Sequence, residues 1–176
     1  MQAHIEQCVF GNVECPYLPC QEKMPLGNIV GHLKNTNKAI ETKHREPNAD
    51  RIFWPVDQQT PNQNYKAIIH HFDGHCFIFN CNMKDSNMTF WTIIVGSEED
   101  AQRYKVSMSI SGELVDGATK TLGKVYSIEM TKTDVLKSTS GILEISPKMI
   151  TMVGRTWDNG RFCVCIDYNI GLAMFY

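Results

Sequence analysis

Two cysteines and a histidine near the start of the chain have the types and spacing of a metal site. Cys15 and Cys20 are separated by four residues, and eleven more residues lead to His32. Thiolates and an imidazole at such intervals are typical zinc ligands, which converge on the ion as a tetrahedron. A fourth ligand is expected about 3–5 residues after the histidine, where the chain reads Leu-Lys-Asn-Thr-Asn. The sequence therefore predicts a zinc site that lacks one conventional ligand.

The composition is that of an ordinary globular protein and argues against binding to nucleic acids or membranes. Of the 176 residues, 43% are hydrophobic and 20% are charged, as in typical domains with a core. The net charge is −2, without the basic cluster of a nucleic-acid-binding protein. No apolar run approaches the roughly 20 residues that span a bilayer, and the first residues lack a signal-peptide pattern. We expect a cytoplasmic or nuclear protein.

The pattern of the chain divides it into three parts. Residues 1–37 hold the cysteine-rich knot, residues 38–50 are polar and predict a connector, and residues 51–176 alternate short β-type runs with turns. About eight strands with little helix predict an antiparallel β-sandwich. The expected strands cover residues 65–71, 76–83, 88–95, 106–110, 124–130, 141–145, 149–153 and 162–168.

Local signals predict some boundaries directly. The run Phe-Asp-Gly-His at 72–75 is a hairpin signal between two strands. Ser97, followed by three acidic residues, predicts a capped helix over about 97–104, because serine accepts backbone N–H bonds and acids favour a helix start. A short helical turn is also expected near 133–137.

The histidines around the hairpin do not predict a second site. His70 and His71 are consecutive on an expected strand and therefore point to opposite faces. We expect them, with His75 and Cys76, to lie on a solvated strand end and loop. Since no nucleophile and base can be paired, the sequence predicts no catalytic residue.

Five spaced motifs follow one another in the order found in a known family. They are His4-x3-Cys8-x6-Cys15-Pro16, Cys20-x11-His32-Leu33, Asp50-x2-Phe53-x3-Asp57-x3-Pro61, Gly74-x2-Phe77 and Ile94-x-Gly96-x4-Ala101. Their order and spacing resemble the substrate-binding half of the seven in absentia (SIAH) ubiquitin ligases over nearly the whole chain. The resemblance implies a mostly β fold, in which a partial or degenerate SIAH-type zinc finger (1–37) precedes a TRAF-like eight-stranded antiparallel β-sandwich (51–176) with one or two short helices.

The same resemblance implies zinc as the cofactor, held by Cys15, Cys20 and His32. The second finger of the family ends in a histidine where this chain has Asn37, and an amide is a poor zinc ligand beside imidazole or thiolate. Cys8 or His44 could complete the tetrahedron, or the knot could be metal-free and held by packing. The sequence leaves these alternatives open.

The resemblance also implies a peptide-binding edge on the sandwich. In the family an extended peptide adds to an edge strand, and the strand lining that groove alternates Val-x-Trp-x-Met. The corresponding positions here are Asn64, Lys66 and Ile68. Because Lys66 replaces the aromatic platform and aromatic residues supply most anchor energy in such grooves, we expect a more polar or acidic peptide.

The implied function is that of a substrate- or adaptor-binding module of an E3 ubiquitin ligase, which recruits protein targets as a homodimer. The RING domain that binds the ubiquitin-conjugating enzyme in this family has no counterpart in the chain and would lie upstream or in a partner. An alternative is a non-catalytic TRAF-like scaffold or regulator that binds partners without ubiquitin transfer.

Overall fold

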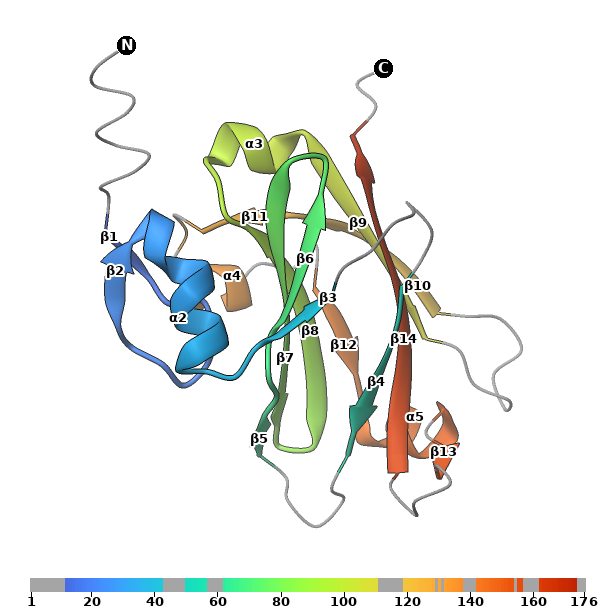
Figure 1. Ribbon diagram of the computed structural model, residues 1–176. Coiled ribbons are helices and arrows are strands. Elements are labelled where there is room, and N and C mark those ends of the chain that lie inside the picture. Colours follow the sequence, from blue (N-terminus) through green and yellow to red (C-terminus); the bar gives the residue numbers. More distant parts are fainter. Residues whose placement is uncertain are drawn as a thin grey trace, which may run out of the picture.

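The computed structural model describes residues 12–42, 50–56, 62–110, 119–128, 130, 132–137, 142–153, 155–156 and 162–173. These residues form many strands and a few short helices (Figure 1). The prediction of a mostly β fold is therefore confirmed. Among the helices of this described part, none is long and apolar enough to cross a membrane.

The strands and helices follow in chain order. They are β1 (Asn12–Glu14), β2 (Lys23–Pro25), η1 (Leu26–Asn28), α2 (Ile29–Asn35), β3 (Ile40–Thr42), β4 (Asp50–Pro55), β5 (Gln63–Asn64), β6 (Ile68–Phe72), β7 (His75–Lys84), β8 (Asn87–Ile94), α3 (Glu98–Gln102), β9 (Tyr104–Ile110), β10 (Thr119–Lys124), β11 (Tyr126–Ser127), α4 (Lys132–Lys137), β12 (Leu143–Ile145), α5 (Pro147–Val153), β13 (Arg155–Thr156) and β14 (Phe162–Leu172).

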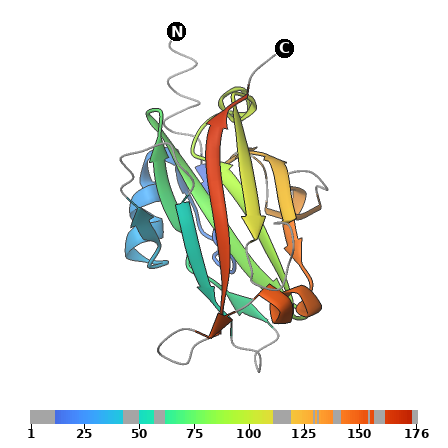
Figure 2. The ribbon, with the colours of Figure 1, turned by 90° about the vertical axis from the view of Figure 1, so that its right-hand side faces the viewer.

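Two larger sheets form the body of the protein. In the first the strand order is β11-β8-β7-β6-β3, with β12 also paired to β8 and β5 to β7. The second runs β10-β9-β14-β13, with β4 on the other side of β14. Figure 2 shows the second sheet in front, with the long β14 near its middle and the first sheet behind it. Most pairs are antiparallel, but β3 runs parallel to β6 and β11 parallel to β8, so the arrangement is not wholly antiparallel.

The space between the two sheets is filled by alternate residues of their strands, which we call the inter-sheet core. On β9 the residues at 106, 108 and 110 are buried and those between them are more exposed, as expected for a strand with one face in a core. Aromatic rings at the centre meet edge to face or stacked. The largest members of this core are Trp54, Tyr65, Phe77, Phe79, Phe90, Tyr104 and Tyr168.

A second apolar cluster lies between the first sheet and the N-terminal segment, and we call it the knot core. It joins Cys15, Met24, Ile29 and Leu33 to sheet residues Ala67, Ile69, Ile78, Trp91 and Ile93, with Tyr126, Ile128 and Val135 at one side. The hairpin β1–β2 and helix α2 therefore lie on the face of the first sheet that is turned away from the second sheet (Figure 1).

Both hairpin turns of the first sheet are tight and require unusual backbone angles. Asp73 and Gly74 have φ of 49° and 75°, and Asp85 and Ser86 have φ of 50° and 64°. Positive φ at both central residues is the pattern of two-residue hairpin turns whose twist matches that of the strands. The hairpin predicted at 72–75 is confirmed, with Phe72 paired to His75.

Helix α3 begins as predicted. The hydroxyl of Ser97 accepts a hydrogen bond from the Asp100 backbone N–H at 3.1 Å, and the Asp100 carboxylate accepts one from the Ser97 N–H. This capping box satisfies two backbone donors at the helix start. The helix is shorter than expected and ends at Gln102.

The prediction of a strand at 149–153 is wrong, because this segment belongs to helix α5. The reason is visible in the two residues before it. Ser146 accepts a hydrogen bond from the Met149 N–H through its hydroxyl and from the Ile150 N–H through its carbonyl, and Pro147 occupies the first helical position, where proline is favoured. In the described part of the chain, three short helices therefore follow residue 51, one more than predicted.

The segment predicted as a connector contributes a strand. Within residues 38–50, β3 pairs in parallel with β6, with Ile40 opposite Ile68, and β4 starts at Asp50. Residues 43–49 of the segment lie outside the described part. The knot is therefore tied to the first sheet by backbone hydrogen bonds as well as by apolar packing.

Candidate metal centre

The hairpin β1–β2 positions the two cysteines. The strands pair antiparallel with Val13 opposite Met24, and just beyond β1 the Cys15 N–H donates to the Glu22 carbonyl oxygen at 2.8 Å. Cys15 is fully buried in the knot core, and Cys20 lies half-buried in the loop between the strands. The loop thus folds back so that its two thiols face the same side.

Helix α2 supplies the histidine. Ile29 and Leu33 are fully buried against the sheet, and His32, next to Leu33, faces the hairpin with its side chain only 9% exposed. His32 lies inside this helix, which spans Ile29–Asn35. Apolar docking of one helix face therefore fixes the imidazole against the cysteine loop.

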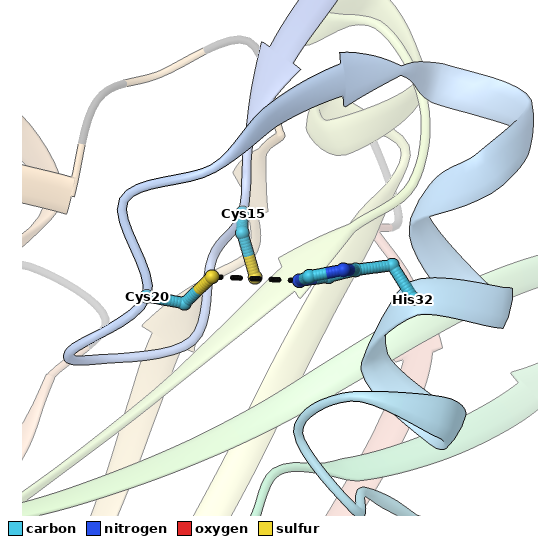
Figure 3. A group of neighbouring side chains, drawn as sticks. All are labelled: Cys15, Cys20 and His32. Carbon is cyan, nitrogen blue, oxygen red and sulfur yellow. Dashed lines mark hydrogen bonds between the residues drawn. The ribbon is translucent and has the colours of Figure 1, made fainter.

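The three side chains converge as the sequence predicted (Figure 3). Their ligand atoms all lie within 4.8 Å of one another, and Cys20 Sγ is 3.4 Å from His32 Nε2. Tetrahedral zinc with bond lengths of about 2.0–2.3 Å places its ligand atoms about 3.4–3.8 Å apart. The cluster could therefore hold a metal ion, and two thiolates with one imidazole suit zinc better than magnesium or calcium.

Glu22 lies on the outer side of the imidazole. Its carboxylate is 3.6 Å from His32 Nδ1, longer than a hydrogen bond but close enough to attract an N–H at that nitrogen. Carboxylates in this position orient a ligating imidazole and leave Nε2 free to bind the ion. Sequence reasoning missed Glu22, although its place two residues after Cys20 would have allowed the inference.

Asn37 lies beside two of the three candidate ligands. Its side-chain Nδ2 lies 3.2 Å from Cys15 Sγ and 3.1 Å from His32 Nε2. The two other candidates for a fourth ligand, Cys8 and His44, lie outside the described residues. Asn37, at the position where the sequence lacks a conventional ligand, thus lies beside Cys15 and His32.

Tyr17 adds to the electrostatics of the cysteine loop. Burial raises the pKa of the Tyr17 hydroxyl, and negative charge on Cys15 and Cys20 raises it further. The hydroxyl therefore stays neutral and does not add a further negative charge beside the two thiolates.

The predicted peptide-binding edge is divided between the surface and the core. Asn64 and Lys66 are exposed, whereas Ile68 is 4% exposed and belongs to the inter-sheet core. From Ile68 onward the edge of β6 is paired with β3. Asn64 and Lys66 are therefore the part of this edge whose side chains can reach a partner.

The histidines near the hairpin are placed differently from the prediction of a solvated region. His70 is buried between the sheets, with its ring edge to face against Tyr168, while His71 is exposed and contacts Glu41 at 3.1 Å.

Burial, and then the charge of Glu41, raises the pKa of the Cys76 thiol to about 11. This thiol stays protonated at neutral pH, which does not suit a nucleophile.

A polar group that sequence reasoning did not assemble joins the hairpin to α3 and β9. The Tyr104 hydroxyl donates to Asp73 Oδ2 at 2.8 Å and lies 3.0 Å from His75 Nδ1, and His75 Nε2 lies 3.6 Å from Asp100. The tight turn at 73–74 is thereby tied to the start of the helix.

A scan against models of protein families found none that matches, and a search of curated proteins found no matching relative.

Proposed function

We propose that this chain is the target-binding module of a ubiquitin ligase of the seven in absentia type, with a zinc-bound knot bracing a TRAF-like sandwich. The observation that carries the proposal is the convergence of Cys15, Cys20 and His32 on a knot docked against the first sheet. The five spaced motifs support the choice of this family, because they follow one another from the knot into the sheets in the order that the family has.

The metal in this proposal is structural. Cys15 is fully buried and the three ligands come from a hairpin loop and a helix, so an ion between them would link these two elements. Bound zinc would neutralise the thiolates and add its binding free energy to folding, as in other small zinc domains. The residues that would hold it are the two cysteines and the histidine.

The binding function is assigned to the edge of the first sheet near β5. An extended peptide can continue a sheet through backbone hydrogen bonds, with alternate side chains supplying specificity. Asn64 and Lys66 are exposed there, and the ammonium group of Lys66 favours an acidic or polar peptide. Homodimerisation, which the family resemblance implies, would present two such edges.

A display library of extended random peptides, selected on the purified zinc-loaded chain, tests this binding. The chain should select acidic peptides, and Lys66→Glu should reverse the preference toward basic ones. Lys105→Glu is the matched control, because Lys105 is an exposed lysine on β9 of the other sheet. Failure to enrich any motif, or the same motif with Lys66→Glu, would refute binding at this edge.

A scaffold without ubiquitin transfer is the second candidate, favoured by Lys66 standing where the family has an aromatic platform. The transcript upstream of the Met1 codon separates the two. A continuous frame that encodes a RING domain supports the ligase, and a start codon at Met1 supports the scaffold.

A further inference from the structure

The end of helix α2 directs Asn37 back toward the metal site. The Thr36 N–H donates to the His32 carbonyl at 2.8 Å, and after Lys38, whose φ is 56°, the Ala39 N–H donates to the Leu33 carbonyl at 2.9 Å. This turn reverses the chain over the helix end. Asn37 therefore lies beside His32 although four residues separate them in sequence.

Asn37 contacts two of the three candidate ligands, Cys15 and His32. Its amide group is 3.2 Å from Cys15 Sγ and 3.1 Å from His32 Nε2, while Cys20 Sγ is 3.4 Å from His32 Nε2. These separations are close to the roughly 3.4–3.8 Å between ligand atoms of tetrahedral zinc. The amide thus stands where a fourth ligand atom would be.

Whether Asn37 can bind a metal ion depends on which end of its amide, Nδ2 or Oδ1, faces Cys15 and His32. As the structure has it, Nδ2 points at the sulfur and the imidazole nitrogen, which accept its hydrogen bonds. A cation between these atoms uses the same lone pairs and repels an N–H group. The oxygen and nitrogen ends of an asparagine amide are nearly equal in size, so a half turn of the amide replaces the donor by Oδ1 without other movement.

We propose that Asn37 closes the metal site, with Oδ1 as the fourth ligand when the ion is bound and Nδ2 as a hydrogen-bond donor when it is not. The inference rests on the proposed zinc site and names what completes it. Asn37 is half-buried, so its removal would open the fourth position to solvent. Because an amide oxygen is a weaker zinc ligand than imidazole, the site is closed but binds less tightly than one with four soft ligands.

Cobalt(II) bound in place of zinc reports the fourth position through its visible absorption spectrum, and imidazole serves as the external probe. The spectrum of the unaltered chain should not change as imidazole is added. Asn37→Ala should acquire an imidazole-dependent change, because the fourth position is then held by exchangeable water. Asn37→Asp should remain insensitive, since its carboxylate supplies an oxygen at the same place.

Zinc affinity, measured by competition with a chelating dye, gives a second readout. Asn37→Ala should bind zinc at least about tenfold more weakly, a loss typical of removing a group that supports a metal site, and Asn37→Asp should bind as tightly as the unaltered chain or more so. Asn35→Ala is the matched control, because Asn35 is an exposed asparagine at the same helix end. Its affinity should be unchanged.

The outcomes separate this inference from the proposed function. An unaltered chain that binds cobalt(II) but responds to imidazole has an open fourth position, which overturns the role of Asn37 and leaves the zinc site standing. Equal zinc affinity of Asn37→Ala and the unaltered chain overturns it as well. If the unaltered chain binds neither metal, the zinc site itself is refuted, and the role of Asn37 with it. The imidazole titration of the unaltered chain needs no variant, so a misfolded variant does not prevent the test.

Discussion

The two apolar clusters of this protein are held together in different ways. The inter-sheet core is filled by strands from both sheets, and its aromatic residues contact one another directly. The knot core receives four buried hydrophobic side chains from residues 12–42, of which three are fully buried and Met24 is 9% exposed. The strands of this segment have three residues each, and its helix α2 has seven. A segment shorter than about 40 residues rarely folds on apolar burial alone. We therefore predict that the sheets fold without a metal, whereas the knot depends on the zinc ion of the proposed function.

Phe79→Ala should have the largest effect on stability. Phe79 is 1% exposed and stacks on Tyr168 with ring centroids 4.9 Å apart, and a buried phenylalanine replaced by alanine costs about 3–5 kcal/mol. Urea denaturation should show this loss in the free energy of unfolding equally with and without zinc. A loss that depended on zinc would contradict the independence of the inter-sheet core.

Leu33→Ala should act on the knot and depend on zinc. Leu33 is fully buried in the knot core beside His32, so its truncation should cost about 2–5 kcal/mol in the zinc-loaded protein. Hydrogen exchange should rise in residues 12–42 more than in β9 and β14. If exchange rose uniformly over the chain, the knot would not be a separately stabilised region.

Ser97→Ala tests a part of the protein that is independent of the knot. Loss of this helix cap should cost about 1 kcal/mol. Burial raises the pKa of Asp100, but hydrogen bonds from Ser97 and the nearby His75 together hold it below its usual value of 3.8. A lowered pKa stabilises the fold above pH 3.8 and the contribution is lost as the pH falls through the folded value. Acid titration of stability should therefore be flatter in Ser97→Ala than in the unaltered chain, and an unchanged acid profile would contradict the role of the cap.

Glu41→Gln should have the smallest effect, because exposed ion pairs contribute little. Hydrogen bonds from Lys34 and then His71 lower the pKa of Glu41, so the contribution is present at neutral pH and lost as the pH falls through that lowered value. This carboxylate joins α2 to β6 on the knot side. Hydrogen exchange in α2 should be slightly faster in the variant than in the unaltered chain at pH 7, and equal to it in acid. A large increase at pH 7 would show that ion pairs rather than apolar contacts hold the helix on the sheet.

Features that depend on neighbouring residues could be predicted from the sequence, whereas features that depend on long-range pairing could not. The hairpin at 72–75 and the cap at Ser97 were predictable because their chemistry lies within four residues. Strand β3 was not, since three residues without an apolar pattern become a strand only by pairing with β6, 28 positions later. Helix α5 could have been predicted from Ser146 and Pro147, whose capping preference was outweighed by the β-type residues after them.

The metal cluster shows the same limit. The spacing of Cys15, Cys20 and His32 predicted their convergence, because a short loop and one helix suffice to bring them together. The position of Asn37 depends on the turn at Lys38, where a lysine adopts a positive φ that its residue type does not favour. The sequence could therefore show that a conventional ligand was missing, but not that Asn37 lies beside Cys15 and His32.

Metal analysis of the purified chain tests the central claim most directly. Protein prepared without chelators should contain about one zinc ion per chain, as expected for a single tetrahedral site. Cys20→Ser should contain almost none, while Cys76→Ser, which alters a cysteine outside the cluster, should retain it. An unaltered chain without zinc, or a Cys20→Ser variant that keeps its zinc, would contradict the account of a knot held by metal.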